Sequence, residues 1–150
     1  MPHIHEKIDL TVEVFIVHKN KVLLRKHDKY EIWLSVGGHI ELDEDPNQAA
    51  IREVKEEVGL DIELIDYRDF IFEDERFKEL IPPVALNRHR ISDAHEHVTM
   101  VYYAKTNSDK IIPEKDTDEW KWCEKDDIEK LDNTPKDVVY HAKRALAQIT

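Results

Sequence analysis

Residues 46–58 carry signals for both ends of an α-helix. Asp45 can accept a hydrogen bond at the N-cap, Pro46 suits the first helical position, and Gln48 stands at capping-box spacing from Asp45. Gly59 can take the left-handed conformation that ends a helix. The sequence therefore predicts a helix from Pro46 to about Val58. Its buried stripe recurs at three- and four-residue spacing and consists of Ala50, Ile51, Val54 and Val58.

Three glutamates share one face of this predicted helix. Glu53, Glu56 and Glu57 stand at i, i+3 and i+4, so their like charges repel by a few tenths of a kcal/mol per pair, roughly. They need either open water or a cation, and a solvated acidic face is the simpler reading in a chain with 37% charged residues. Carboxylates, however, are the ligands that Mg²⁺ takes together with substrate phosphates. Gly37 and Gly38 precede the helix and allow the backbone to approach a ligand closely.

Residues 38–60 resemble the signature of the Nudix hydrolases at every fixed position. That signature is G, five residues, E, seven residues, R-E-U-x-E-E-x-G-U, where U is a bulky aliphatic residue. Many members carry proline where this chain has Ser35, a departure that affects the turn more than the chemistry. The matching residues are Gly38, Glu44, Arg52, Glu53, Val54, Glu56, Glu57, Gly59 and Leu60.

The resemblance implies a single domain over residues 1–150, an α/β/α Nudix sandwich with a mixed β-sheet between helices. It also implies Mg²⁺ (or Mn²⁺) held by the glutamates of the helix, joined by a backbone carbonyl. The implied metal ligands are Gly38, Glu53, Glu56 and Glu57. The spacing of Arg52 predicts that its guanidinium orients one of these glutamates, and Glu44 is expected to brace the loop before the helix.

The reaction implied by the resemblance is metal-dependent hydrolysis of a phosphoanhydride bond in a nucleoside diphosphate linked to another moiety. The favoured substrate is a nucleoside triphosphate, oxidised forms included. The alternatives are an ADP-ribose, nucleotide-sugar or dinucleoside polyphosphate hydrolase, a catalytically silent nucleotide sensor, and a structural domain with an acidic helix. Glu53, Glu96 and Glu119 are the candidates for the general base, between which geometry has to decide.

Substrate contacts are predicted more weakly than metal ligands. Arg25, Arg88 and Arg90 can contact phosphates but can equally be ordinary surface arginines. Trp33 can stack on a base, although its short apolar strand favours a place in the core. Asn133 can contact a base or serve as an N-cap. These residues, with Gly37 and Gly38, form the predicted substrate-binding set.

Histidines 89, 95 and 97 raise the question of a zinc cluster, since imidazole is a zinc ligand. His95 and His97 share one face of a predicted strand. Because no cysteine lies nearby in the sequence, we expect scattered polar histidines instead of a metal cluster.

Composition narrows the class of protein. One core suits 150 residues with 41% hydrophobic content and a mean hydropathy of −0.63. The net charge of −11 disfavours a binder of duplex nucleic acid. The partner that the resemblance implies is a small nucleotide. No stretch reaches the roughly 20 apolar residues that cross a bilayer. The single cysteine, Cys123, and an N-terminus without signal-peptide character favour the cytoplasm.

The remaining pattern predicts strands around the helix and a helix at the end. A long connection, residues 73–96, is expected to form a lid-like loop, and a homodimer is one option because this loop can pack on a second subunit. A terminal helix is predicted over residues 136–148. The predicted strands are 7–18, 22–25, 32–36, 62–72, 98–104 and 119–123.

Overall fold

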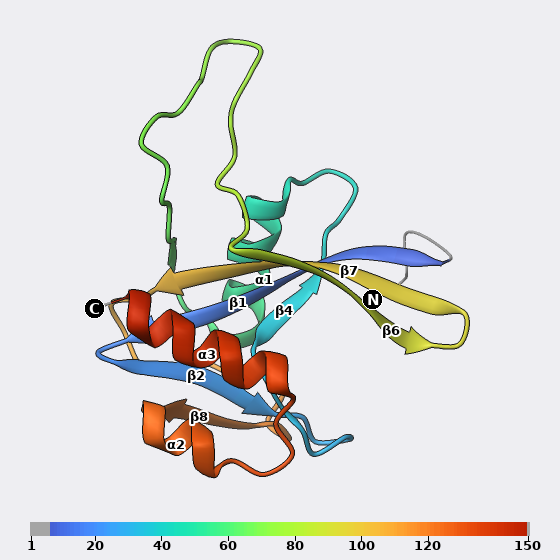
Figure 1. The fold of residues 1–150 in the computed structure, drawn as a ribbon, viewed down its shortest axis with the longest axis vertical. Coiled ribbons are helices and arrows are strands. Elements are labelled where there is room, and N and C mark those ends of the chain that lie inside the picture. Colours follow the sequence, from blue (N-terminus) through green and yellow to red (C-terminus); the bar gives the residue numbers. More distant parts are fainter. Residues whose placement is uncertain (1–6, 150) are drawn as a thin grey trace.

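The computed structural model describes residues 7–149 and shows a mixed β-sheet between helices (Figure 1). Residues 1–6, which the N-terminal prediction concerns, and Thr150 lie outside the described part. Helix α1 covers one face of the sheet and helix α3 the other. The fold class predicted from the resemblance is confirmed. The helices are α1 (Pro46–Val58), α2 (Lys125–Lys130) and α3 (Lys136–Gln148).

All the strands belong to one eight-stranded sheet with the order β3-β2-β1-β7-β5. In addition, β4 pairs with β1, β6 with β7, and β8 with β2. The sheet is mixed because β1 and β7 are parallel while the other pairs are antiparallel. The strands are β1 (Ile8–His18), β2 (Lys21–Lys26), β3 (Trp33–Leu34), β4 (Val36–His39), β5 (Glu63–Leu64), β6 (Ala85–Ser92), β7 (His95–Lys105) and β8 (Glu119–Cys123).

Strand β1 organises the core because both of its faces are covered. Val12, Val14 and Ile16 belong to the cluster that includes α1, whereas Phe15 and Val17 belong to the cluster that includes α3. A strand buried on both faces reads as a nearly continuous apolar run, as this one does. Both core clusters therefore depend on the same strand.

The same strand changes partners along its length. Its first half pairs with β4 over residues 11–14, and its end pairs with β2 over residues 17–18. The first of these pairings places Gly38 opposite Val12, in the middle of the molecule. Gly37 and Gly38 are therefore held in the sheet, as part of β4, before the chain reaches α1.

Two predictions about the middle of the chain are wrong. The strand expected over residues 62–72 ends at Leu64, and the loop expected over 73–96 contains β6. The reason lies in β7, because β6 pairs with it from His95 to Val101, where a longer β5 would have to continue. Most of β6 is exposed, so its sequence lacks the apolar alternation that marks a half-buried strand.

The irregular segment is therefore residues 65–84, which projects from the sheet (Figure 1). Arg68 ties its base together by donating to Asp66 and to the carbonyls of Glu79 and Leu80. Asn47 of α1 holds the C-terminal part of this segment through two hydrogen bonds with the backbone of Ile81, at 2.8 and 2.9 Å. This segment thus has fixed ends on both the sheet and the motif helix.

Other differences are smaller. The short helix α2 was not predicted, because six residues with one buried side chain, Ile128, carry little periodicity. Strand β7 begins at His95 instead of residue 98. The terminal helix has the predicted bounds. In the described part of the chain, no helix is both long and apolar enough to cross a membrane.

Candidate active site

Helix α1 begins and ends as its sequence predicts. The Asp45 carboxylate accepts a hydrogen bond from the Gln48 backbone at 2.9 Å, and the Gln48 side chain accepts one from the Asp45 backbone at the same distance. Pro46 takes the first turn, and Gly59 ends the helix with φ 70°. Because both ends are capped, the bounds of the helix are defined, and the three glutamates lie between these bounds.

Arg52 connects the loop before α1 to the glutamates on it. Its Nη2 lies 2.6 Å from Glu44 Oε1 and donates to the carbonyl of His39 at 2.9 Å, while Nε donates to Glu44 Oε2 at 2.9 Å. Its Nη1 donates to Glu53 at 2.9 Å and to Glu56 at 3.1 Å. The contacts predicted for Arg52 and Glu44 are therefore present. Arg52 lowers the pKa of Glu44, and this paired carboxylate is held ionised.

Glu53 lies against Gly38 in strand β4. A Cβ atom on Gly38 would fall well inside 3.0 Å of the Glu53 carboxyl group, so only glycine leaves room for it. Glu53 is 4% exposed, and burial raises its pKa although Arg52 opposes the shift. A carboxylate is thus packed directly against the backbone of Gly38.

Glu57 lies one turn further along the helix and is partly buried. Burial raises its pKa to about 7, with Arg25 opposing the shift and Glu53 adding to it. Its Oε2 atom is buried and has no hydrogen-bond partner among the described residues. A buried carboxylate oxygen without a partner is costly unless a cation or a proton satisfies it.

Glu53, Glu57 and the backbone of Gly38 therefore fit a hard divalent cation. Their donor atoms are all oxygens, which Mg²⁺ and Mn²⁺ accept. Glu56 differs from the other two glutamates because half of its side chain is exposed and its carboxylate is paired with Arg52. The helical spacing alone treated the three as equivalent, whereas burial distinguishes them.

A small pocket lined by both basic and acidic side chains lies beside Glu57. Arg25 lies 3.2 Å from Asp118 and its guanidinium lies over the Trp120 ring, 5.7 Å from the centroid. The Glu114 backbone donates to the Glu57 carbonyl at 2.9 Å, and its carboxylate contributes to the raised pKa of Glu57. The pocket of about 70 Å³ is lined by Arg25, Glu57, Glu114, Lys115, Asp118 and Trp120. Sequence reasoning found Arg25 but missed Glu114 and Asp118, which no motif marks.

A larger pocket of about 280 Å³ is lined by Gly37 and Gly38. Arg25 and His97 also line it, and Glu13 of β1 lies within it. Burial raises the pKa of Glu13 to about 7, Asp137 adds to this shift, and Ser35 opposes it. Glu13 was missed because an acid within an apolar strand gives no signal of its side chain's surroundings.

The other predicted residues lie in varied places. Glu96 is paired with Arg88 at 2.7 Å. It stands four positions along β7 from Met100, which pairs with Val12 as Gly38 does, so Glu96 lies about 13 Å from the level of Gly38. Glu119 is exposed at the start of β8, next to the Asp118 that contacts Arg25. The structure therefore brings neither Glu96 nor Glu119 into contact with the motif carboxylates.

Three of the residues predicted to bind substrate, Trp33, Asn133 and Arg90, lie away from the motif carboxylates or have another structural role. Trp33 is 5% exposed in the core cluster beneath α3, so its predicted stacking on a base is wrong. Asn133 is not the N-cap of α3, which is Pro135; its carbonyl accepts from the Trp33 backbone at 3.2 Å. Arg90 lies on β6 opposite Glu96, in the same exposed strand as Arg88.

The histidines expected to be scattered lie together. The rings of His95 and His97 are 5.1 Å apart, and those of His89 and His97 are 5.6 Å apart. Burial lowers the pKa of His97 to about 4, and the neighbouring imidazoles add to this shift. The expectation failed because the pairing of β6 with β7, which sets His89 opposite His97, exists only in the folded sheet.

Comparison with known proteins gives consistent results. The NUDIX domain profile matches residues 7–143. A crystal structure of a NUDIX-family hydrolase from Clostridium perfringens is 36% identical, with a TM-score of 0.85 over 95% of this chain and 98% of that chain. The E. coli dihydroneopterin triphosphate pyrophosphohydrolase shares the fold at 19% identity, with a TM-score of 0.63 over 95% of this chain and 97% of that one.

A curated relative matches over a shorter stretch. The dihydroneopterin triphosphate diphosphatase of Haemophilus influenzae is 48% identical over 52 residues. This match spans 34% of the chain and 33% of the relative, so it covers about a third of either protein.

A mixed sheet between helices, with the buried carboxylate of Glu53 packed against Gly38 of β4, defines an α/β/α sandwich with an oxygen-rich candidate cation site. The extent of the profile match then identifies the family. The chain belongs to the Nudix hydrolases.

The raised pKa values predict how the stability of the metal-free protein depends on pH. Glu13 and Glu57 each shift from 4.5 to about 7 on folding, so the folded state binds more protons than the unfolded state between these values. Their contribution to the free energy of unfolding is therefore present below pH 4.5 and is lost as pH rises to about 7. The loss is on the order of 3 kcal/mol for each group.

Thermal unfolding of chelator-treated protein across this pH range checks the expectation. His97 acts in the opposite direction, because its lowered pKa makes stability rise with pH between about 4 and 6.5. The difference between the wild type and Glu13→Gln isolates one carboxyl group. A difference that does not change between pH 4.5 and 7 would contradict the shift assigned to Glu13.

Proposed function

We propose that this chain hydrolyses a phosphoanhydride bond in a nucleoside diphosphate linked to another moiety, with Mg²⁺ or Mn²⁺ as cofactor. A nucleoside triphosphate, oxidised forms included, is the leading substrate class. One observation carries the proposal: Glu53 is buried beside Gly38, burial raises the pKa values of Glu53 and Glu57, and the buried Oε2 atom of Glu57 has no hydrogen-bond partner among the described residues. Such a carboxylate set gains stability from a divalent cation.

The residues of the candidate site would have different roles in this reaction. Glu53, Glu57 and the Gly38 carbonyl would hold the cation, which when bound neutralises phosphate charge and lowers the pKa of a bound water. Arg52 keeps Glu53 oriented, and Glu56 completes the acidic face. Arg25, which lines both pockets, is placed to contact a phosphate oxygen.

The general base requires a group near the cation site. Of the three predicted candidates, Glu53 is already in that site, whereas Glu96 and Glu119 lack a contact with it. Glu114, whose backbone is hydrogen-bonded to Glu57, is a further candidate. We therefore propose Glu53 or Glu114 for this role and assign Arg88 and Arg90 to the outer surface of the sheet.

The base of the substrate has a candidate partner in Glu13. Its carboxyl group lies in the pocket of about 280 Å³, and its Oε1 atom has no hydrogen-bond partner among the described residues. An ionised carboxylate accepts hydrogen bonds only, and so it suits a ring edge that carries N–H and NH₂ donors. Guanine and pterin both present such an edge. The name of the H. influenzae relative adds a pterin triphosphate to the substrates worth testing.

A metal-dependent screen with product identification tests the function. We expect turnover in Mg²⁺ of nucleoside triphosphates or a pterin triphosphate, with pyrophosphate or phosphate identified as product. Oxidised nucleotides, ADP-ribose, nucleotide sugars and dinucleoside polyphosphates complete the panel. Glu13→Gln should reduce kcat/KM for guanine and pterin substrates about tenfold or more relative to a pyrimidine triphosphate. Binding without any product across the panel would favour the nucleotide sensor instead.

The homodimer and the cytoplasmic location remain predictions. Exposed aromatic residues on the 65–84 segment supply apolar surface for a second copy: Tyr67, Phe70, Phe72 and Phe77. We propose that this segment, and not the whole of residues 73–96, forms the contact between subunits.

A further inference from the structure

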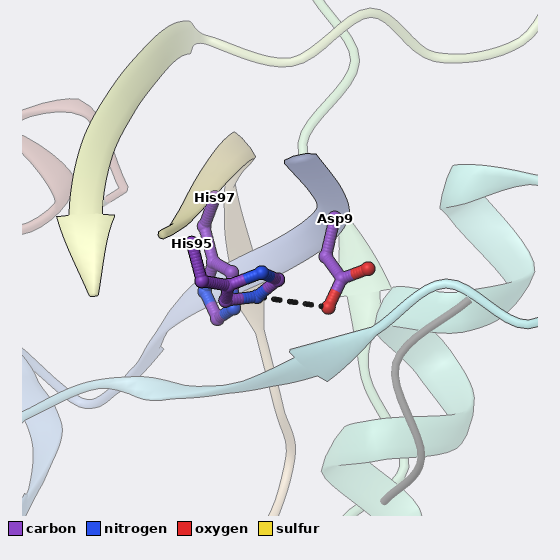
Figure 2. A group of neighbouring side chains, drawn as sticks. All are labelled: Asp9, His95 and His97. Carbon is purple, nitrogen blue, oxygen red and sulfur yellow. Dashed lines mark ion pairs between the residues drawn. The ribbon is translucent and has the colours of Figure 1, made fainter. Parts of the chain in front are cut away.

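A cluster of three histidines and one aspartate occupies one end of the sheet. The parallel pairing of β1 with β7 places Asp9 level with His97 (Figure 2). Strand β4, which pairs with the other edge of β1, ends at His39. His95 and His97 alternate with Glu96 along β7, so they point to the same face. Asp9, His39, His95 and His97 therefore meet although they come from three strands.

The distances within the cluster suit a shared cation. His95 Nε2 and His39 Nε2 each lie 3.1 Å from Asp9 Oδ2. One donor atom from each of Asp9, His95 and His97 lies within 4.8 Å of the others. Nitrogen and oxygen ligands about 2 Å from a zinc-like ion are separated by roughly 3–4 Å in a tetrahedral site. Small rotations of the rings would close the arrangement.

Burial makes the cluster more than a group of surface side chains. Asp9 is 1% exposed, and the side chains of His95 and His39 are 12% and 16% exposed. A buried carboxylate requires a cation or several donors close by. Two imidazoles and one carboxylate form the ligand set that zinc-class ions take in sites with one open position.

We propose that Asp9, His95 and His97 bind one zinc-class divalent cation, and that His39 orients Asp9. The site is separate from the all-oxygen site at Glu53 and Glu57. Val12 of β1 pairs with Gly38, and Asp9 stands three positions before Val12 on the same strand, so Asp9 lies about 10 Å from the level of Gly38. His97 also lines the pocket of about 280 Å³, so the cation would lie at its edge. The proposal does not depend on hydrolysis of any substrate.

A Co²⁺ titration tests the site without using activity. The protein is first treated with chelator and then titrated in millimolar Mg²⁺, which occupies the oxygen site and does not compete for imidazole. We expect one equivalent of Co²⁺ to give visible absorption bands typical of nitrogen ligation, and Zn²⁺ to remove them. His95→Gln and His97→Gln should each weaken binding by at least ~100-fold, because loss of a ligand costs no less than loss of a residue that supports one.

Matched variants make the result decisive. His27→Gln removes a histidine that pairs with Asp28 outside the cluster, and Glu57→Gln alters the oxygen site; both should leave the Co²⁺ bands unchanged. His3→Ala combined with His5→Ala covers the histidines outside the described part of the chain and should also retain binding. Circular dichroism of each metal-free variant establishes that it is folded. Asp9→Asn should weaken Co²⁺ binding as the histidine variants do; if this variant does not fold, the two histidine variants alone decide.

Three results would overturn the proposal. The first is the absence of bands in the wild type, which would leave a hydrogen-bonded Asp-His network without metal. The second is binding that survives in both His95→Gln and His97→Gln. The third is binding that disappears with His3 and His5 or with Glu57, because the cation would then belong to another site.

Discussion

Replacing Glu57 with glutamine is expected to abolish metal-dependent hydrolysis and, above pH 7, to stabilise the metal-free protein. Glutamine keeps the shape of the side chain but removes the charge that holds a cation. A loss of several kcal/mol of transition-state stabilisation corresponds to a decrease in kcat on the order of 10³-fold. The measurements are product formation in Mg²⁺ and the melting temperature in chelator.

The gain in stability follows from the pKa of Glu57. Burial raises it to about 7, so above pH 7 the metal-free fold must hold a buried charge that the glutamine variant lacks. Mg²⁺ should then raise the melting temperature of the wild type but not of Glu57→Gln. Glu63→Gln, at a largely exposed position, is the control and should change neither property. Equal activity of Glu57→Gln and the wild type would remove the main support for the proposed site.

Alanine at Gly38 and at Gly37 should have opposite consequences. At Gly38, the new Cβ meets only the end of the flexible Glu53 side chain. We therefore expect the fold to survive with a change in unfolding free energy below about 1 kcal/mol, while Glu53 is displaced and Mn²⁺ affinity falls by ~100-fold. Calorimetric titration with Mn²⁺ and thermal unfolding measure the two effects separately.

At Gly37, the new Cβ meets the backbone carbonyl of Val12 instead. Because Val12 lies in the central strand of the sheet, this variant should lose about 1–3 kcal/mol of stability through overpacking. Loss of Mn²⁺ binding in Gly37→Ala with full stability, or a collapse of the fold in Gly38→Ala, would show that the two glycines have been assigned the wrong roles.

Local signals explain why the motif helix could be predicted closely. Asp45, Pro46, Gln48 and Gly59 act within a few residues of themselves, so their effect does not depend on distant parts of the chain. The Arg52–Glu56 contact is equally local, because both side chains stand on one helix at four-residue spacing. The resemblance to the family extended this local reading to the whole fold.

Errors arose where one segment depends on the position of another. The strand predicted over 62–72 stops at Leu64 because β6 already occupies the edge of β7, and β6 itself is too exposed to show a pattern. Of the two places that the sequence left open for Trp33, the fold gives it the one in the core, where α3 covers it. Neither outcome is encoded near the residues concerned.

The sequence by itself determined the family, the ends of α1 and the set of glutamates that α1 presents, because these follow from residue types at short, fixed spacing. Only the tertiary structure decided that Glu53 is buried and Glu57 partly buried while half of the Glu56 side chain is exposed, since burial is set by the packing of α1 against β4 and the sheet. It also brought Asp9 to His95, across 86 residues of chain, because parallel pairing of β1 with β7 aligns strands that are distant in sequence.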